Sequence, residues 1–286
     1  MTRSAGRVQG SARTLDKPRR GKLAIHLALI AGALIMMVPL LWMLTTSLKT
    51  TRSVHLPPYL LPTEFAWSNY IEAWRAADFA RFYINSGVMT VGIVGGQLLF
   101  SSLAGYAFAR LKFPGRNLLF FLVLATMMVP LYVTLIPSYL IVRWLGWLDS
   151  YQGLIAPRLV SAFGIFLMRQ FYLSIPSELE EAALMDGASR LRIWWSIALP
   201  LSMPALATLG IFAFLFSWND FLWPLIVTSS AGMRTVQLGL AEFTGRYGTR
   251  WTLLTAGSLT ATLPAIIAFL IGQRWLVRGI RVERMK

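Results

Sequence analysis

The sequence contains no cysteine, only two histidines and only 12 acidic residues among 286. Without cysteine the chain can form no disulfide, no thiolate metal site and no cysteine nucleophile. The two histidines, His26 in an apolar run and His55 in a loop, do not form a pair in the sequence. A metal or catalytic cluster needs several such groups together. We therefore expect no catalytic and no metal-binding residue on this chain.

Charge is scarce as well, since only 14% of the residues are charged, compared with about a quarter in soluble domains. Hydrophobic residues make up 56% of the chain, and the mean hydropathy is +0.59. This composition predicts an integral membrane protein. The net charge of +15 would also suit a nucleic-acid binder. However, the basic residues stand at the chain ends and in short loops between apolar runs, as the positive-inside rule predicts.

Six apolar stretches are long enough to cross a bilayer, which predicts an all-α integral membrane fold. We expect the helices at about residues 23–47, 84–109, 118–136, 153–171, 203–226 and 253–271. The first is too long for a signal peptide, so we expect an uncleaved helix kinked near Pro39. Glycine and serine in the second predict close helix packing. Pro130 should interrupt the third span, and Pro137 should end it.

The distribution of lysine and arginine predicts that both termini are cytoplasmic. With that orientation the inside segments carry 18 basic residues and the outside segments carry 8. We therefore divide the chain into a basic, disordered cytoplasmic tail (1–22), a transmembrane domain (23–272) and a cytoplasmic C-terminal tail (273–286). The connector 172–200, within the transmembrane domain, then faces the cytoplasm.

This connector holds four of the 12 acidic residues, which is unusual in so apolar a chain. Ser177 with Glu180 forms a capping box, which predicts a helix from Glu178 to about Asp186. Gly187 should then provide a sharp turn. Ser189 should cap a second helix, Arg190 to Ala198, ahead of a break at Leu199-Pro200. The pattern predicts a helix–turn–helix on the cytoplasmic face.

Two interpretations of this segment remain open. Trp194 and Trp195 fit an ordinary amphipathic helix lying at the membrane interface. Such a helix does not explain Ala182-Ala183 between acidic residues, because small side chains leave a shallow surface that another protein can approach. Docking of a soluble partner explains these small residues.

The same residues resemble a known motif. Glu181-Ala182-Ala183, Asp186-Gly187-Ala188, Ile197, Leu199 and Pro200 match the EAA motif of ABC importer permeases. Supporting matches are spread along the chain: Asn85-Ser86, Tyr106-Ala107-Phe108-Ala109-Arg110, Phe113-Pro114-Gly115-Arg116 and Trp218-Asn219-Asp220. Together they resemble the carbohydrate branch, specifically its MalG-like permease subunit, over residues 23–280.

The resemblance implies a type I ABC importer permease fold in a bacterial inner membrane. It implies as partners a second permease subunit, two cytoplasmic ATPase subunits and an extracytoplasmic solute-binding protein. ATP and magnesium would then belong to the ATPase, and this chain would carry no cofactor. The ATPase-coupling residues would be Glu181, Ala182, Ala183, Asp186, Gly187, Ala188, Leu199 and Pro200.

The C-terminal tail departs from the family pattern. MalG-like chains usually end in a small, flexible sequence, whereas this chain ends in a charged one after Gly279. A contact between this tail and the ATPase would therefore be absent or electrostatic.

Three polar residues in apolar spans are candidates for the translocation pathway. An acid within a membrane span is a functional candidate, which nominates Asp220 with its neighbour Asn219. Alternatively, Asp220 is solvated at the interface or paired within the bundle. Arg158 stands a few residues inside the outer end of the fourth span. It either snorkels to the interface or faces the pathway and helps to bind an anionic solute.

Four functions remain to be compared. The first is the permease of an importer for a sugar or sugar derivative, and the second a permease of the same superfamily for glycerol phosphate or a peptide. A self-sufficient secondary transporter would need ionisable residues near mid-membrane and related halves, which the sequence does not show. A membrane-embedded enzyme would need the clustered catalytic groups that this chain lacks.

Overall fold

The computed structural model describes residues 19–55, 57, 61–245 and 248–282, with side chains from Leu23 to Trp275. Residues 1–18 and 283–286 of the expected tails lie outside the described residues. The described chain is mostly helical, with one short two-stranded sheet. The expected all-α architecture is therefore confirmed.

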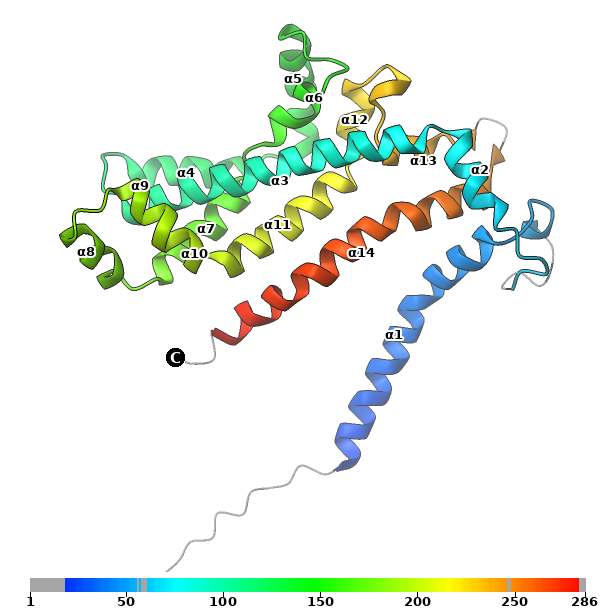
Figure 1. The fold of residues 1–286 in the computed structure, drawn as a ribbon, viewed down its shortest axis with the longest axis horizontal. Helices are drawn as coiled ribbons and strands as arrows, with labels where there is room; N and C mark the ends of the chain where they lie inside the picture. Colours follow the sequence, from blue (N-terminus) through cyan, green and yellow to red (C-terminus); the bar gives the residue numbers. More distant parts are fainter. Residues whose placement is uncertain (1–18, 56, 58–60, 246–247, 283–286) are drawn as a thin grey trace, which may run out of the picture.

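Three helices are long and apolar enough to cross a membrane on their own: α1 (Arg19–Ser47), α3 (Phe79–Arg110) and α14 (Trp251–Val282). Helix α1 begins four residues before the expected boundary and continues through Pro39. Helices α3 and α14 lie along the molecule with α11 (Met203–Trp218) between them (Figure 1).

Two of the other three expected spans are bent pairs of helices, whereas the expected span 203–226 divides into α11, which ends at Trp218, and the separate helix α12 (Leu222–Val227). Helices α4 (Arg116–Thr126) and α5 (Leu131–Trp144) meet at 99°. Residues Tyr151–Arg158, which form α6 (Tyr151–Ile155) and η2 (Ala156–Arg158), meet α7 (Ala162–Ser174) at 44°. Residues Arg190–Leu201 meet α11 at 77°. Counting each pair as one span gives up to six candidate spans.

Proline accounts for the sharpest of these bends. Of the two prolines expected to shape the third span, Pro130 interrupts it as predicted, and Pro137 does not end it. Pro130 stands directly before α5, where its ring disfavours a helical conformation in the residue before it. Pro137 does not end the span, because α5 continues past it to Trp144. The expected end of the third span at Pro137 was therefore wrong.

Short elements connect these helices. They are η1 (Ser53–His55), α2 (Ser68–Ala76), α8 (Glu178–Met185), α9 (Arg190–Ile193), the π-helix η3 (Trp194–Ala198), α10 (Leu199–Leu201), α12 (Leu222–Val227), η4 (Ala231–Met233) and α13 (Val236–Ala241). Strands β1 (Thr244–Gly245) and β2 (Gly248–Thr249) pair antiparallel, with Thr244 opposite Thr249.

Glycine allows α3 and α7 to pack closely, as the small residues of the second span predicted. A methyl group added at Gly105 would lie 2.7 Å from Cβ of Met168. Gly164 on α7 likewise faces the side chain of Ser101 on α3. In lipid the hydrophobic effect contributes little to the association of helices, so helices depend on close contacts of this kind.

At the opposite end from α8, Asn85 fastens three elements together. Its Nδ2 donates to the carbonyl oxygens of Gly232 and Arg234, both at 2.8 Å, and its Oδ1 accepts from the Tyr151 hydroxyl at 2.7 Å. The neighbouring Ser86 accepts a bond from the Val236 amide at 2.9 Å. The Asn85-Ser86 pair therefore holds α6 and the connection before α13 against α3.

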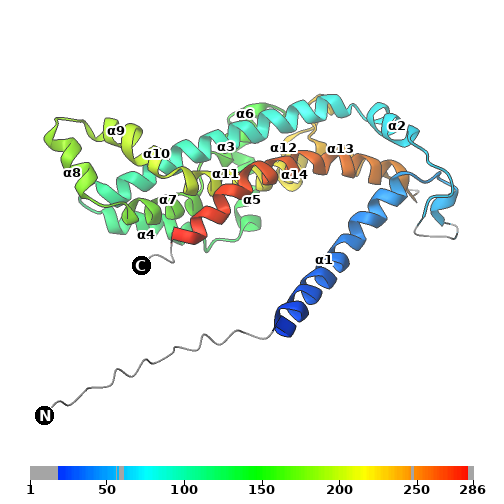
Figure 2. The same ribbon diagram turned by 60° about the horizontal axis from the view of Figure 1, so that its bottom comes forward.

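Helix α1 diverges from the body of the molecule toward its N-terminal end (Figure 2). Its C-terminal end is attached through an edge-on contact between Trp42 and Trp251. In addition, Asn69 of α2 donates to the carbonyl oxygens of Ser47 and Lys49, both at 2.8 Å. Most of the apolar side chains of α1 are exposed.

Candidate functional site

The acidic connector forms the expected helix–turn–helix, but the break expected at Leu199-Pro200 was wrong, because the second helical segment continues to Leu201 and bends only before α11. Helix α8 ends at Met185, one residue earlier than predicted, and Gly187 follows with φ of +75°. Residues with a side chain rarely adopt this left-handed backbone conformation, whereas glycine adopts it readily, which explains why glycine stands here. Ser189 caps the second helix by accepting a bond from the Arg192 amide at 3.3 Å.

The predicted cap at the first helix does not form. Ser177 has φ of −69° and ψ of −25° and makes no side-chain capping bond. A capping residue normally has an extended backbone, which directs its oxygen toward the free amides of the first turn. Ser177 is already helical, so the capping-box prediction was wrong.

Adjacent acids of α8 point in different directions. Glu181 is exposed, whereas only 4% of Glu180 is exposed. The Glu180 Oε1 lies 3.1 Å from Nε of Arg110, and its Oε2 lies 3.7 Å from Nη1 of Arg190. The same Oε2 accepts a hydrogen bond from the Tyr106 hydroxyl at 3.2 Å. Glu180 thus anchors α8 internally, whereas the sequence pattern predicted only a capping role for it.

Arg110 extends this anchor to the end of α7. Its Nη2 donates to the carbonyl oxygen of Tyr172 at 2.6 Å and also to that of Ile175. These carbonyls lie at and just beyond the C-terminal end of α7, where few backbone donors are available, although the Tyr172 carbonyl also accepts a bond from the Ile175 amide at 3.3 Å. One arginine at the end of α3 therefore connects the end of α7 to the buried acid of α8.

The outward face of the connector combines acidic, small and large apolar residues. Four of the predicted docking residues in α8 and the turn after it are exposed: Glu181, Ala182, Asp186 and Gly187. Among them stand large exposed apolar side chains, of which Met185 is 89% exposed. The others are Leu179, Leu191 and Trp195. We call these eight residues the connector face.

Three further predicted docking residues pack inward. Ala183, Ala188 and Leu199 are partly buried against a hydrophobic core that contains Met168 and Leu209. Pro200 is exposed. The motif therefore divides into an exposed part and a part that fixes the connector on the body of the molecule.

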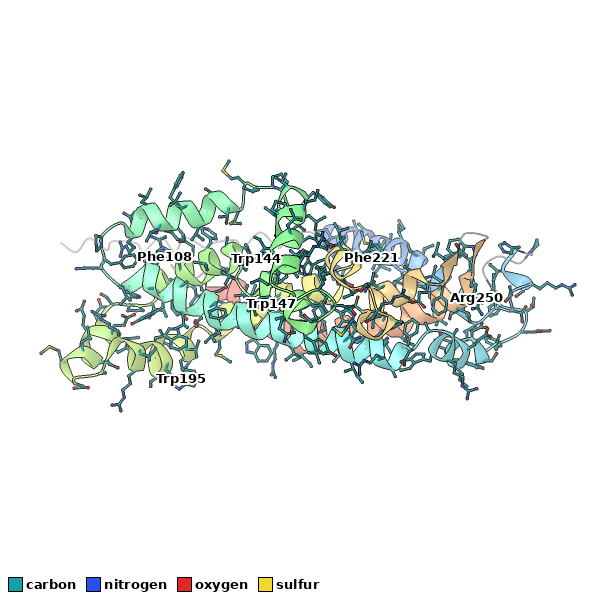
Figure 3. The ribbon with its side chains drawn as sticks, turned by 90° about the horizontal axis from the view of Figure 1, so that it is seen from above. Phe108, Trp144, Trp147, Trp195, Phe221 and Arg250 are labelled. Atoms are coloured by element: carbon teal, nitrogen blue, oxygen red, sulfur yellow. The ribbon has the colours of Figure 1, made fainter. Side chains whose placement is uncertain are left out.

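Trp194 and Trp195 also differ. Trp194 is buried and donates from Nε1 to the Ser102 hydroxyl at 3.0 Å, and Ser102 is 2.6 Å from the Tyr172 hydroxyl. Ser202 donates to the same tyrosine oxygen at 3.3 Å. Only Trp195 is available to an interface or a partner, so the expectation that both tryptophans lie at the interface was wrong for Trp194. Figure 3 places Trp195 toward the same end of the molecule as Phe108, with Arg250 toward the opposite end.

A second candidate site is a cavity of about 420 Å³ between α3, α11 and the bend before α7. Gln97 lines it from α3, Arg158 and Ser161 from the bend, and Phe212 and Phe216 from α11. Ligand sites in proteins are commonly of this size and largely apolar, with a few polar groups.

Arg158 and Asp220 form an ion pair at the edge of this cavity. Nη2 of Arg158 lies 3.5 Å from Oδ2 of Asp220, and the two side chains are 13% and 10% exposed. The guanidinium also lies over the rings of Phe216 and Trp223, at 5.3 and 5.7 Å from the ring centres. The Trp223 amide donates to the other carboxylate oxygen of Asp220 at 3.2 Å.

The depth of Arg158 follows from its contact with α3. Its carbonyl oxygen accepts a bond at 2.9 Å from Gln97, which stands near the middle of α3. At 1.5 Å per residue, Gln97 lies about 20 Å from the Arg110 end of that helix. Arg158 is therefore deeper than the outer position expected from the sequence, and Asp220 is paired within the bundle, which is one of the alternatives left open for it.

The third pathway candidate is separate from this pair. Asn219 donates to the Leu215 carbonyl oxygen at 2.9 Å and accepts a bond from Gln237 at 3.4 Å. It does not line the cavity. The structure thus joins Arg158 with Asp220 and leaves Asn219 outside the site.

Residues 97–282 match the family model described as "Binding-protein-dependent transport system inner membrane component". Similar proteins include the sn-glycerol-3-phosphate transport system permease protein UgpE of Yersinia enterocolitica, which is 38% identical over 272 residues. The alignment covers 92% of this chain and 97% of that protein. The protein of the same name from Brucella abortus is 34% identical, with 89% and 94% covered.

Two solved structures share the fold. One is a chain of a bacterial ABC transporter involved in the import of the acidic polysaccharide alginate. Its TM-score is 0.80 at 27% identity, with 90% of this chain and 98% of that chain covered. The other is a chain of a bacterial alginate ABC transporter in complex with a pentasaccharide-bound periplasmic protein. It has a TM-score of 0.63 at 14% identity, with 93% and 96% covered, which supports the fold alone.

Proposed function

Because the chain belongs to the family of binding-protein-dependent transport system inner membrane components, we propose that it forms half of the translocation pathway of an ATP-driven importer. It is a permease subunit and a multi-pass membrane protein, and it has no catalytic role of its own. The second half of the pathway would come from another permease subunit. Two cytoplasmic ATPase subunits and an extracytoplasmic solute-binding protein would complete the complex.

The connector face would be the surface that docks on an ATPase subunit. It exposes Glu181 and Asp186 for polar contacts, and Ala182 and Gly187 allow close approach. Met185 is almost fully exposed, although burying a side chain of this size is favourable by about 1.5–3 kcal/mol. A face with both features is better suited to a protein partner than to water.

The observation that carries this proposal is the difference between Glu180, which is buried, and Glu181, which is exposed. Glu180 is bound to Arg110 at the end of α3, so a force applied to α8 reaches the membrane-spanning part through an ion pair. Glu181 on the next position is exposed and available to a partner. This arrangement would couple ATPase movement to the pathway.

We place both termini in the cytoplasm. The excess of basic residues in the inside segments supports this orientation. The arrangement of the molecule also supports it, because Trp195 from an inside segment and Phe108, two residues before another inside segment, lie toward one end, and Arg250 from an outside segment lies toward the other (Figure 3).

The solute would be a sugar or sugar derivative, and a small phosphorylated polyol is the form that this chain favours. The similar permeases from Yersinia enterocolitica and Brucella abortus are named for sn-glycerol 3-phosphate. A neutral sugar does not explain a buried arginine beside a cavity, whereas an anionic solute does.

The test is co-purification of the tagged chain in mild detergent, with Glu181→Lys and Gly187→Pro as variants. The native chain should bring an ATPase and a second permease with it, and both variants should lose the ATPase. Glu64→Lys makes the same charge change at an exposed position of the expected outer loop and should retain it. A chain that purifies alone and still moves solute without ATP would contradict the proposal.

A further inference from the structure

We propose that Arg158 binds the anionic group of the solute and that Asp220 is the internal anion that occupies Arg158 until the solute displaces it. This inference rests on the proposed function, because it assigns the solute-binding group of that pathway. The ligand chemistry is a phosphate monoester on a small polar body.

The pair is poorly explained as a structural device. Removing two charges from water is costly, and a buried ion pair offsets this cost only with short, well-aligned contacts. Here the nearest charged atoms are 3.5 Å apart. Within the described residues, the guanidinium of Arg158 makes no other ion pair and no hydrogen bond to a protein group. Arginine has several N–H donors in a planar fork, which match phosphate oxygens in pairs. Most of this donor capacity is therefore unused.

The surroundings hold the guanidinium in place while leaving room for a ligand. Phe216 and Trp223 contact it through their ring faces, which favours a fixed orientation. On the cavity side stand Gln97 and Ser161, which offer polar groups, and Phe212, which offers an apolar surface. A polyol phosphate needs this combination of one cation, some hydrogen-bonding groups and apolar contact.

The chain bends beside Arg158 in a way that also favours an anion. Helix α7 begins at Ala162 after the 44° bend, and Ser161 is its capping residue. Broken membrane helices in transporters direct the positive end of a half-helix toward anionic solutes. The start of α7 and Arg158 contribute positive potential to the same cavity.

Asp220 can leave Arg158 without losing all its partners. Its Oδ1 accepts a bond from the Trp223 amide, which stays in place when Oδ2 is released. The exchange therefore replaces one anion by another at Arg158 and leaves a solvated or hydrogen-bonded carboxylate behind. A neutral solute cannot make this exchange, so the pair would select for anions.

The experiment measures binding to the purified importer complex, without the solute-binding protein, by calorimetric titration. The probes are sn-glycerol 3-phosphate and its uncharged counterpart, glycerol. Wild type should bind the phosphate and not glycerol. Asp220→Asn removes the competing anion and should tighten phosphate binding by about tenfold, the effect of one charge-assisted contact. Arg158→Gln should abolish phosphate binding.

Because Arg158→Gln leaves a buried acid unpaired, a loss of binding in that variant alone does not distinguish misfolding from the loss of the binding group. The double variant Arg158→Gln/Asp220→Asn removes both charges together, so that no buried charge is left unpaired, and serves as the folding control. It should assemble with the ATPase and still fail to bind the phosphate. An assembled double variant that binds like wild type would overturn the inference, as would Asp220→Asn with unchanged or weaker affinity. Failure of wild type to assemble with an ATPase would instead contradict the proposed function.

Discussion

Glu180 and Arg110 lie 3.1 Å apart in a place where both are largely excluded from water, although 70 residues separate them in the chain. This ion pair joins α8 of the connector to the end of α3. Arg190 and Tyr106 contribute further contacts to the same carboxylate. The connector is therefore fixed to the membrane-spanning body by a buried charge, and its exposed face is left free.

We expect Glu180→Gln to lower the free energy of unfolding by about 3–5 kcal/mol, because it leaves the charge of Arg110 without its buried partner. Glu181→Gln is the matched control, since it makes the same chemical change at the adjacent exposed position. It should leave the unfolding temperature in detergent unchanged and weaken ATPase binding instead. Equal loss of stability in both variants would show that Glu180 is not the anchor.

We expect the two tryptophans of the connector to respond differently to replacement by phenylalanine. Trp194→Phe removes the bond to Ser102 and should destabilise the protein by about 0.5–1.5 kcal/mol, the net value of one buried hydrogen bond. Trp195→Phe should have no measurable effect on stability, because its side chain is exposed. Thermal unfolding of the purified chain distinguishes them, and a larger loss from Trp195→Phe would contradict the assignment.

The membrane spans and the connector could be predicted from the sequence because their signals are local. Apolar runs give the spans, and Gly187 with Ser189 gives the turn and second helix to within a few residues. The predicted cap of the first helix was wrong because Ser177 has helical backbone angles, which the capping pattern in the sequence does not indicate.

The ion pairs could not be predicted, because each joins residues far apart in the chain. Arg158 and Asp220 each looked like a residue near the end of a span, and nothing in the sequence indicates that they meet. The sequence near Glu180 indicates its inward position only weakly, because Leu184 lies four residues further along and therefore on the same face of α8. Its partner Arg110, however, comes from another helix.

We expect Gly105→Ala to weaken the packing of α3 against α7. The added methyl group would lie 2.7 Å from Cβ of Met168 and 2.9 Å from the Arg169 amide nitrogen, so the helices must move apart. Overpacking of this kind costs about 1–3 kcal/mol. Gly95→Ala is the control on the same helix, because its methyl group would meet nothing within 4 Å. Equal unfolding temperatures for the two variants would contradict close packing at Gly105.

The loop before α6 should loosen in acid. Asp149 accepts bonds at 3.0 Å from the amides of Ser229 and Ser230, and its φ of 56° holds the backbone in a left-handed turn. Partial burial raises the pKa of its carboxyl group, but the hydrogen bonds from Ser230 and Ser229 outweigh this effect and lower the pKa. The lowered value means that the folded state favours the ionised form.

It follows that the stabilisation from Asp149 is complete above the unfolded pKa of about 3.9 and is lost as the pH falls through the lower, folded pKa. Hydrogen exchange of the Ser229 and Ser230 amides should accelerate in that window relative to amides elsewhere in the same loops. Asp149→Asn should remove this pH dependence, because its amide oxygen accepts the same bonds without titrating. An acid-induced acceleration that persists in Asp149→Asn would assign the effect to another group.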